Sequence, residues 1–156
     1  MIIGVIVAHP DDEVLGVGAT IARQANNGAE VHLLILAQGS TARLSTANLT
    51  SALEMSAIVA SGFLGIKTVE FAGYPDQRLD KLGLLKITQR IEDWLNRYQP
   101  ETIYTHFGGD LNLDHRLTFE AVLTATRPMK GQIVRELYSF EIPSSTEWGF
   151  GQLGDF

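Results

Sequence analysis

The 156-residue chain contains no cysteine, which excludes disulfides, thiolate metal ligands and a thiol nucleophile. It has no apolar run long enough to cross a membrane, and its first residues lack the basic segment and cleavage site of a secretory signal. Basic residues are few: 12 Lys and Arg against 18 Asp and Glu give a net charge of −6. That balance argues against nucleic acid and anionic membranes as partners. We expect a cytoplasmic protein.

Length and composition indicate one globular domain, because 156 residues with 45% hydrophobic side chains suffice for a sizeable core. We expect residues 1–141 to form this domain and residues 142–156 to be a C-terminal tail. The tail contains Trp148, Phe150 and Phe156, and aromatic side chains without a core to join are typical of interfaces. The tail is therefore predicted to pack against a second subunit of a homo-oligomer.

Short apolar runs alternate with helical patterns along the chain. Strands are predicted at residues 2–7, 30–37, 67–71, 102–106 and 133–141, and helices at residues 13–26, 48–62, 84–98 and 115–127. This alternation is typical of an α/β, Rossmann-like, three-layer fold with a doubly wound and mostly parallel sheet. With the strand order 3-2-1-4-5, the switch point lies between the first and fourth strands. Such folds bind ligands there, beyond the carboxyl ends of the strands.

The turn after the first predicted strand carries one imidazole and three carboxylates, in the run His9-Pro10-Asp11-Asp12-Glu13. His9 and Asp12 offer a nitrogen and an oxygen ligand, which suit zinc. Asp11 need not bind the metal and is placed to act as a general base beside it. Acidic residues also stabilise a helix N-terminus by themselves. A histidine that ends a strand adds nothing to that interaction, so the whole run favours a metal site.

The predicted topology brings a second polar segment, residues 106–116, to the same edge of the sheet. It contains His106, Asp110, Asn112, Asp114 and His115. The loop after the second predicted strand carries Arg43 to this edge, where it would bind a sugar hydroxyl or a phosphate, or be a solvated surface residue.

As a pair, the run at residues 9–13 and the segment at residues 106–116 resemble the PIG-L/LmbE-like zinc deacetylases. Weaker similarity lies at residues 74–76 and 141–148. The resemblance implies a Rossmann-like fold and a hydrolase that removes an acetyl group from an N-acetylated sugar or related amide with zinc-activated water. It also implies that His115 completes the zinc site with His9 and Asp12. Three protein ligands leave one position open, as a catalytic zinc requires, and iron accepts the same donors.

These arguments assign a role to each candidate residue. We expect Asp11, Asn112 and Asp114 to act in catalysis, His9, Asp12 and His115 to bind the metal, and Arg43, Asp76, His106 and Asp110 to contact the substrate. For Asp76 the substrate role comes from the resemblance, and a turn-capping role is the alternative. The partner is thus a small N-acetylated molecule.

The chain departs from the family in two places. Asn112 stands where family members carry a second histidine as an electrostatic catalyst. It is able to donate a hydrogen bond but not to act as an acid, so His106, Asp110 or a residue of a partner chain would take that part. The second departure is length, because members of the family generally continue with further strands and a helix.

Two other classes of function stay open. A Mg²⁺-dependent phosphotransfer or receiver-type domain also gathers acids at the end of a first parallel strand, although the pairing of His9 with His115 argues against it. A non-catalytic sugar- or nucleotide-binding module with a vestigial metal site is the other alternative. Asn112 and the short C-terminal part motivate it.

Overall fold

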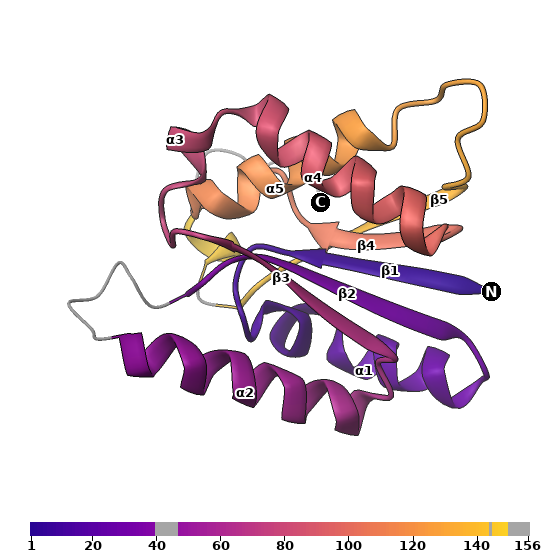
Figure 1. Cartoon of the computed structure of the whole chain (residues 1–156), viewed down its shortest axis with the longest axis horizontal. Helices are drawn as coiled ribbons and strands as arrows, with labels where there is room; N and C mark the ends of the chain where they lie inside the picture. Colours follow the sequence, from indigo (N-terminus) through magenta and orange to yellow (C-terminus); the bar gives the residue numbers. More distant parts are fainter. Residues whose placement is uncertain (40–46, 144, 150–156) are drawn as a thin grey trace.

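The structure is a computed structural model that describes residues 1–39, 47–143 and 145–149. Five parallel strands form one sheet in the order β3-β2-β1-β4-β5 (Figure 1). The strands are β1 (Ile2–Val7), β2 (Glu30–Ala37), β3 (Thr68–Tyr74), β4 (Thr102–His106) and β5 (Glu136–Phe140). The predicted fold class and strand order are therefore confirmed.

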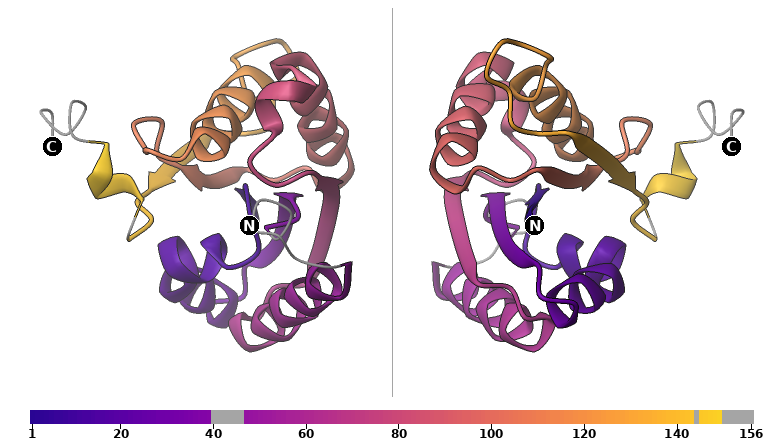
Figure 2. Two further views of the ribbon diagram at one scale, coloured as in Figure 1. Left: turned by 90° about the vertical axis from the view of Figure 1, so that its left-hand side faces the viewer. Right: turned by 90° about the vertical axis from the view of Figure 1, so that its right-hand side faces the viewer.

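Helices cover both faces of this sheet. They are α1 (Asp12–Asn26), α2 (Ala47–Leu64), α3 (Leu79–Leu82), α4 (Leu84–Tyr98) and α5 (Leu113–Ala125), followed by the 3₁₀ turn η1 (Thr146–Trp148). Helices α1 and α2 lie on one face, and α3, α4 and α5 lie on the other (Figures 1 and 2). Parallel neighbours need crossover helices of this kind, which is why the sheet ends up buried on both faces.

The two faces of the sheet hold separate cores. On the α4 side, Ile87, Ile91 and Trp94 are fully buried, as the helical spacing of apolar residues at 84–98 leads one to expect. Burying a side chain of this size contributes about 1.5–3 kcal/mol. Gly4 in β1 makes room for this packing, because a Cβ there would lie 2.6 Å from the Ile103 side chain and 3.0 Å from the Trp94 ring.

Some element boundaries differ from the predicted ones. Strand β3 continues to Tyr74, which pairs with Ala37 after a register shift, and the short helix α3 follows in what was predicted to be a loop. Strand β5 begins only at Glu136. Residues Ile133 and Val134 instead donate their backbone N–H groups to the Gln132 side chain, so local hydrogen bonds replace sheet pairing there.

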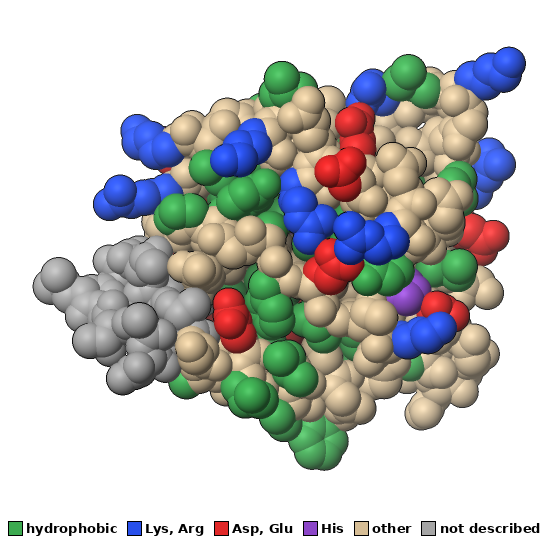
Figure 3. Space-filling view, in the orientation of Figure 1, with side chains coloured by type: hydrophobic (Ala, Val, Ile, Leu, Met, Phe, Trp, Pro, Cys, Tyr) green, Lys and Arg blue, Asp and Glu red, His purple; other side chains and the backbone are tan. Residues whose placement is uncertain are grey.

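The outer face of α2 is apolar. Met55, Ile58, Val59 and Phe63 are exposed, and Phe63 keeps 89% of its surface accessible. Figure 3 shows hydrophobic side chains gathered along this side of the molecule. None of the helices in the described part of the chain is long and apolar enough to span a membrane.

Candidate metal centre

The candidate site begins in the turn that joins β1 to α1. The backbone N–H of His9 donates to Asp12 Oδ2 at 2.8 Å, which folds the Asp12 carboxylate back over the turn. Asp11 has a φ of 110°, in the left-handed region, and its side chain is exposed. The turn therefore buries Asp12 and leaves Asp11 accessible.

His9, Asp12 and His115 meet at the carboxyl ends of β1 and β4. All three are buried, and one possible ligand atom of each lies within 4.8 Å of the others. Asp12 Oδ2 is 3.5 Å from His9 Nδ1 and 3.5 Å from His115 Nε2. Ligands of a tetrahedral zinc with bonds of about 2.1 Å are roughly 3.4 Å apart. The donor set and its spacing therefore fit a zinc ion.

The second ring nitrogen of His9 faces two more carboxylates. His9 Nε2 lies 3.2 Å from Asp76 Oδ1 and 3.2 Å from Asp114 Oδ2. A histidine that binds a metal through one nitrogen commonly donates its other N–H to a carboxylate, which fixes the ring. Asp76 and Asp114 are placed to do this. They also form a second group with His9 whose ligand atoms lie within 4.8 Å of one another.

The electrostatics of this cluster favour positive charge. Burial alone lowers the pKa of His9, but hydrogen bonds with Asp114, Asp12 and Asp76 raise it to about 11. Burial alone raises the pKa of Asp12, and the nearby His106, His9 and His115 more than offset this, so that the pKa lies well below its usual range. Carboxylates that stay ionised in a buried site are the groups that a divalent cation requires.

Asp110 and the segment after β5 orient His115. His115 Nδ1 is 3.2 Å from Asp110 Oδ2. Asp110 in turn accepts hydrogen bonds from Ser145 Oγ and, at 2.7 Å, from Thr146 Oγ1. Although burial raises the pKa of Asp110, its hydrogen bonds with His115, Ser145 and Thr146 hold it well below the usual range. Part of the predicted tail is thus built into the site.

His106 lies behind the trio, fully buried. Its Nε2 accepts the backbone N–H of Ala8 at 2.9 Å and is 3.2 Å from Asp12 Oδ2. Its ring stacks on His115 with centroids 4.0 Å apart. Burial lowers the pKa of His106. The His106 side chain has no exposed surface and packs against Asp12 and His115, and its role as a substrate contact stays a prediction.

The other predicted residues occupy different positions. Asn112 Oδ1 accepts the backbone N–H of Asp114 at 2.9 Å and caps α5. Among the described residues, no acceptor is found for its Nδ2. Asp110 is buried, and its oxygens contact His115, Ser145 and Thr146; its role as a substrate contact stays a prediction. Arg43 lies outside the described residues.

Asp11 and Glu13 complete the turn. Partial burial and the charge of Asp12 raise the pKa of Asp11 to about 6. Glu13 is fully buried, and burial raises its pKa to about 7. Sequence reasoning missed Glu13, because an acidic residue in a first helical turn is ordinary and its burial depends on how α1 packs.

A mostly apolar cavity opens beside this turn, between α1 and α2. Its volume is about 240 Å³, and Asp11, Val14 and Leu53 are among the residues that line it. The accessible carboxylate of Asp11 therefore borders space that a bound molecule is able to enter.

Comparison with known proteins identifies the family. The sequence profile described as PIG-L, GlcNAc-PI de-N-acetylase, matches residues 4–126, a range that includes His9, Asp12 and His115. The chain belongs to the PIG-L family. A search of curated proteins found no match.

Solved structures share the fold of this PIG-L chain. N,N'-diacetylchitobiose deacetylase from Pyrococcus horikoshii superposes with a TM-score of 0.75 at 21% identity, over 91% of this chain and 61% of that one. GalB, the 4-carboxy-2-hydroxymuconate hydratase of Pseudomonas putida KT2440, gives 0.71 at 28% identity, over 90% and 66%. A zinc-inhibited form of teicoplanin deacetylase gives 0.73 at 17% identity, over 90% and 68%. The chain thus spans about two thirds of the length of these proteins.

Proposed function

We propose that this PIG-L chain is a zinc-dependent hydrolase that removes an acetyl group from an N-acetylated sugar or a related amide. The observation that carries the proposal is the meeting of His9, Asp12 and His115 at tetrahedral spacing, with the accessible Asp11 beside them. Family membership supports the reaction class, and the names of the deacetylase neighbours agree with it.

His9, Asp12 and His115 would hold the ion, which when bound supplies a Lewis acid for the amide carbonyl and lowers the pKa of water. Asp11 accepts the proton of the attacking water and later returns it to the leaving amine. The Nδ2 group of Asn112 donates a hydrogen bond to the carbonyl oxygen as negative charge develops there. Asp76, on the β3–α3 loop and 3.2 Å from His9 Nε2, binds a hydroxyl of the substrate.

A hydratase is the second candidate, and the likeness to GalB favours it. Adding water to a carbon–carbon double bond also requires a base that removes a proton from water, and Asp11 is placed for either reaction. The two candidates differ in the product, since only deacetylation releases acetate.

The test is elemental analysis of protein purified without chelators, beside acetate-release assays on N-acetylglucosamine and N,N'-diacetylchitobiose. We expect about one zinc per chain in the unmodified protein, as three ligands around one open position require. His115→Ala should lose the zinc, and the matched control His32→Asn, altered in a histidine of β2 outside the site, should keep it. Asp11→Asn should keep the zinc and lose turnover by about 10²- to 10⁴-fold.

Other results of these experiments would contradict the proposal or change one part of it. Protein that takes up no zinc would contradict the proposal and leave the binding-module alternative. Iron in place of zinc would change the metal but not the ligands. Hydration of an unsaturated acid without acetate release would favour the hydratase, and full activity of Asp11→Asn would refute its role as base.

A further inference from the structure

The backbone of Asp11 is held in a conformation that residues with a Cβ rarely adopt. Its φ of 110° is unfavourable for any residue other than glycine. On one side of the residue, its carbonyl oxygen accepts the N–H groups of Val14 and Leu15, both at 3.0 Å. On the other side, its N–H donates to Glu13 Oε2 at 3.1 Å. Asp11 is thus fixed through both of its peptide groups.

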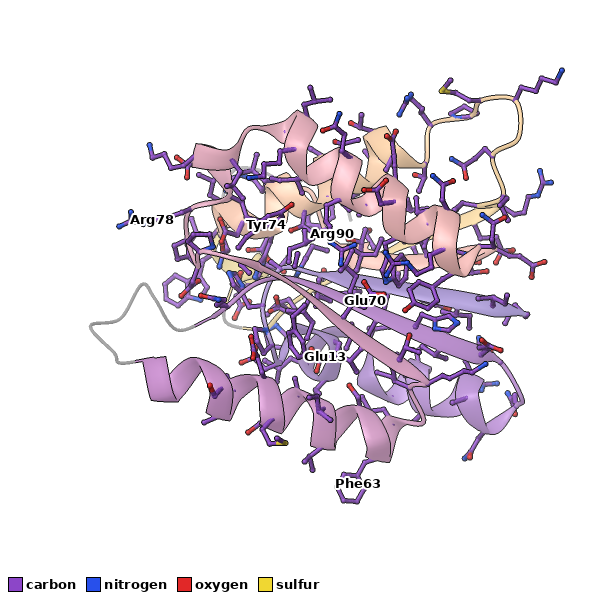
Figure 4. The ribbon with its side chains drawn as sticks, viewed as in Figure 1. Glu13, Phe63, Glu70, Tyr74, Arg78 and Arg90 are labelled. Carbon is purple, nitrogen blue, oxygen red and sulfur yellow. The ribbon has the colours of Figure 1, made fainter. Side chains whose placement is uncertain are left out.

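Glu13 is an unusual residue to find in its position. It is fully buried in the layer between the sheet and α2 (Figure 4). Within the part of the chain that the structure describes, Oε1 has no hydrogen-bond partner. A buried carboxyl group with one unsatisfied oxygen destabilises a fold. Stability therefore does not explain Glu13, whereas the hydrogen bond that it accepts from the Asp11 N–H connects it directly to Asp11.

We infer that Glu13 is a positioning residue that holds the Asp11 backbone in its left-handed conformation and so aims the Asp11 carboxylate at the metal trio. The inference rests on the role proposed above for Asp11. Without an acceptor at this place, the Asp11 N–H loses its partner and the turn relaxes toward an ordinary backbone conformation. The Asp11 side chain then swings away from the water that it deprotonates, while His9, Asp12 and His115 keep their own contacts.

Three substitutions distinguish the effect of the Glu13 hydrogen bond from the effect of the Glu13 charge. Glu13→Gln keeps the length and an acceptor oxygen but removes the charge, Glu13→Asp keeps the charge but shortens the reach, and Glu13→Met removes both. We expect Glu13→Gln to retain kcat within about threefold, and the other two to lose roughly 10- to 100-fold, the effect of misplacing a reacting group by about 1 Å. KM should change less than kcat, because the misplaced group acts on the reacting atoms, and zinc content should be unchanged.

A second readout does not depend on turnover. In NMR spectra, the Asp11 amide proton should exchange slowly with solvent in the unmodified protein and in Glu13→Gln, and rapidly in Glu13→Asp and Glu13→Met. This comparison tests Glu13 even with a protein that releases no acetate, so failure of the proposed function and failure of this inference are distinguishable.

Several results would overturn the inference. They are an unchanged kcat in Glu13→Met, an equal loss in Glu13→Gln and Glu13→Met, loss of zinc in Glu13→Met, and an Asp11 amide that exchanges at the same rate in every variant. If Glu13→Met does not fold, the comparison of Glu13→Gln with Glu13→Asp decides the question by itself.

Discussion

Replacing Asp114 with alanine should remove the hydrogen bonds that hold the β3–α3 loop against helix α5 and so destabilise the fold. The buried Asp114 carboxylate accepts the backbone N–H of Gln77 at 2.8 Å and that of Leu79 at 3.2 Å. It also lies 3.2 Å from His9 Nε2. One side chain thus joins α5, the loop that carries Asp76, and a candidate metal ligand.

The loss of stability depends on whether each of the two backbone N–H groups finds a new hydrogen-bond acceptor once the carboxylate is gone. Gln77 is exposed, so its N–H group finds water and the loss is small, about 0.5–1.5 kcal/mol. Leu79 is fully buried, and its N–H group is left unpaired, which costs about 1–3 kcal/mol. The sum is about 1.5–4.5 kcal/mol. For a chain of this length that corresponds to a fall in Tm of about 3–18 °C.

The assay is urea and thermal unfolding of the metal-free protein, because bound metal adds its own stabilisation to the folded state. Asp114→Asn keeps one acceptor oxygen and should lose about half as much stability. Asp93→Ala, at an exposed position on α4, is the matched control and should change the free energy of unfolding by less than about 0.5 kcal/mol. An Asp114→Ala protein as stable as this control would refute the reasoning.

Two further predictions concern other parts of the molecule. Glu70 and Arg90 lie side by side in Figure 4. Although burial raises the pKa of Glu70, its hydrogen bonds with Tyr98, Arg90 and Arg97 lower it below the ordinary 4.5. Ionised Glu70 therefore stabilises the fold above about pH 4.5, and this contribution disappears as the pH falls through the lower folded-state pKa. Glu70→Gln should lower the free energy of unfolding, measured with urea, by about 1 kcal/mol at pH 7 and by less at pH 3. An equal decrease at both pH values would contradict this. Trp148 is half-exposed, and the predicted homo-oligomer should appear in sedimentation velocity as self-association that Trp148→Ser weakens, whereas a monomer at every concentration would contradict it.

Local patterns in the sequence were enough to predict the sheet. Strands β1 and β2 read as continuous apolar runs because central parallel strands are buried on both faces. Helix α4 was predictable because Ile87, Ile91 and Trp94 recur at helical spacing. Helix α3 was not, since four residues carry too little periodicity to distinguish a single turn from a loop.

The candidate metal trio was also predictable from the sequence. His9 and Asp12 lie in one turn, and the strand order 3-2-1-4-5 places the start of α5, with His115, at the same edge. The resemblance of both segments to one family named His115 as the third ligand. The contacts around the trio could not be predicted from the sequence, because they join residues far apart in the chain. These contacts are Ala8 with His106, and Asp110 with Ser145 and Thr146.

The sequence by itself thus determined the fold class and the candidate residues of the site, because periodicity and residue type are local properties. Only the tertiary structure decided the surroundings of each carboxyl and imidazole group. Packing of α1 against α2 buries Glu13 next to the Asp11 backbone, and packing of β4 between β1 and β5 buries His106 behind the trio. Burial and hydrogen-bond partners depend on which elements meet in space, and they determine which ionisable groups are left open to a ligand.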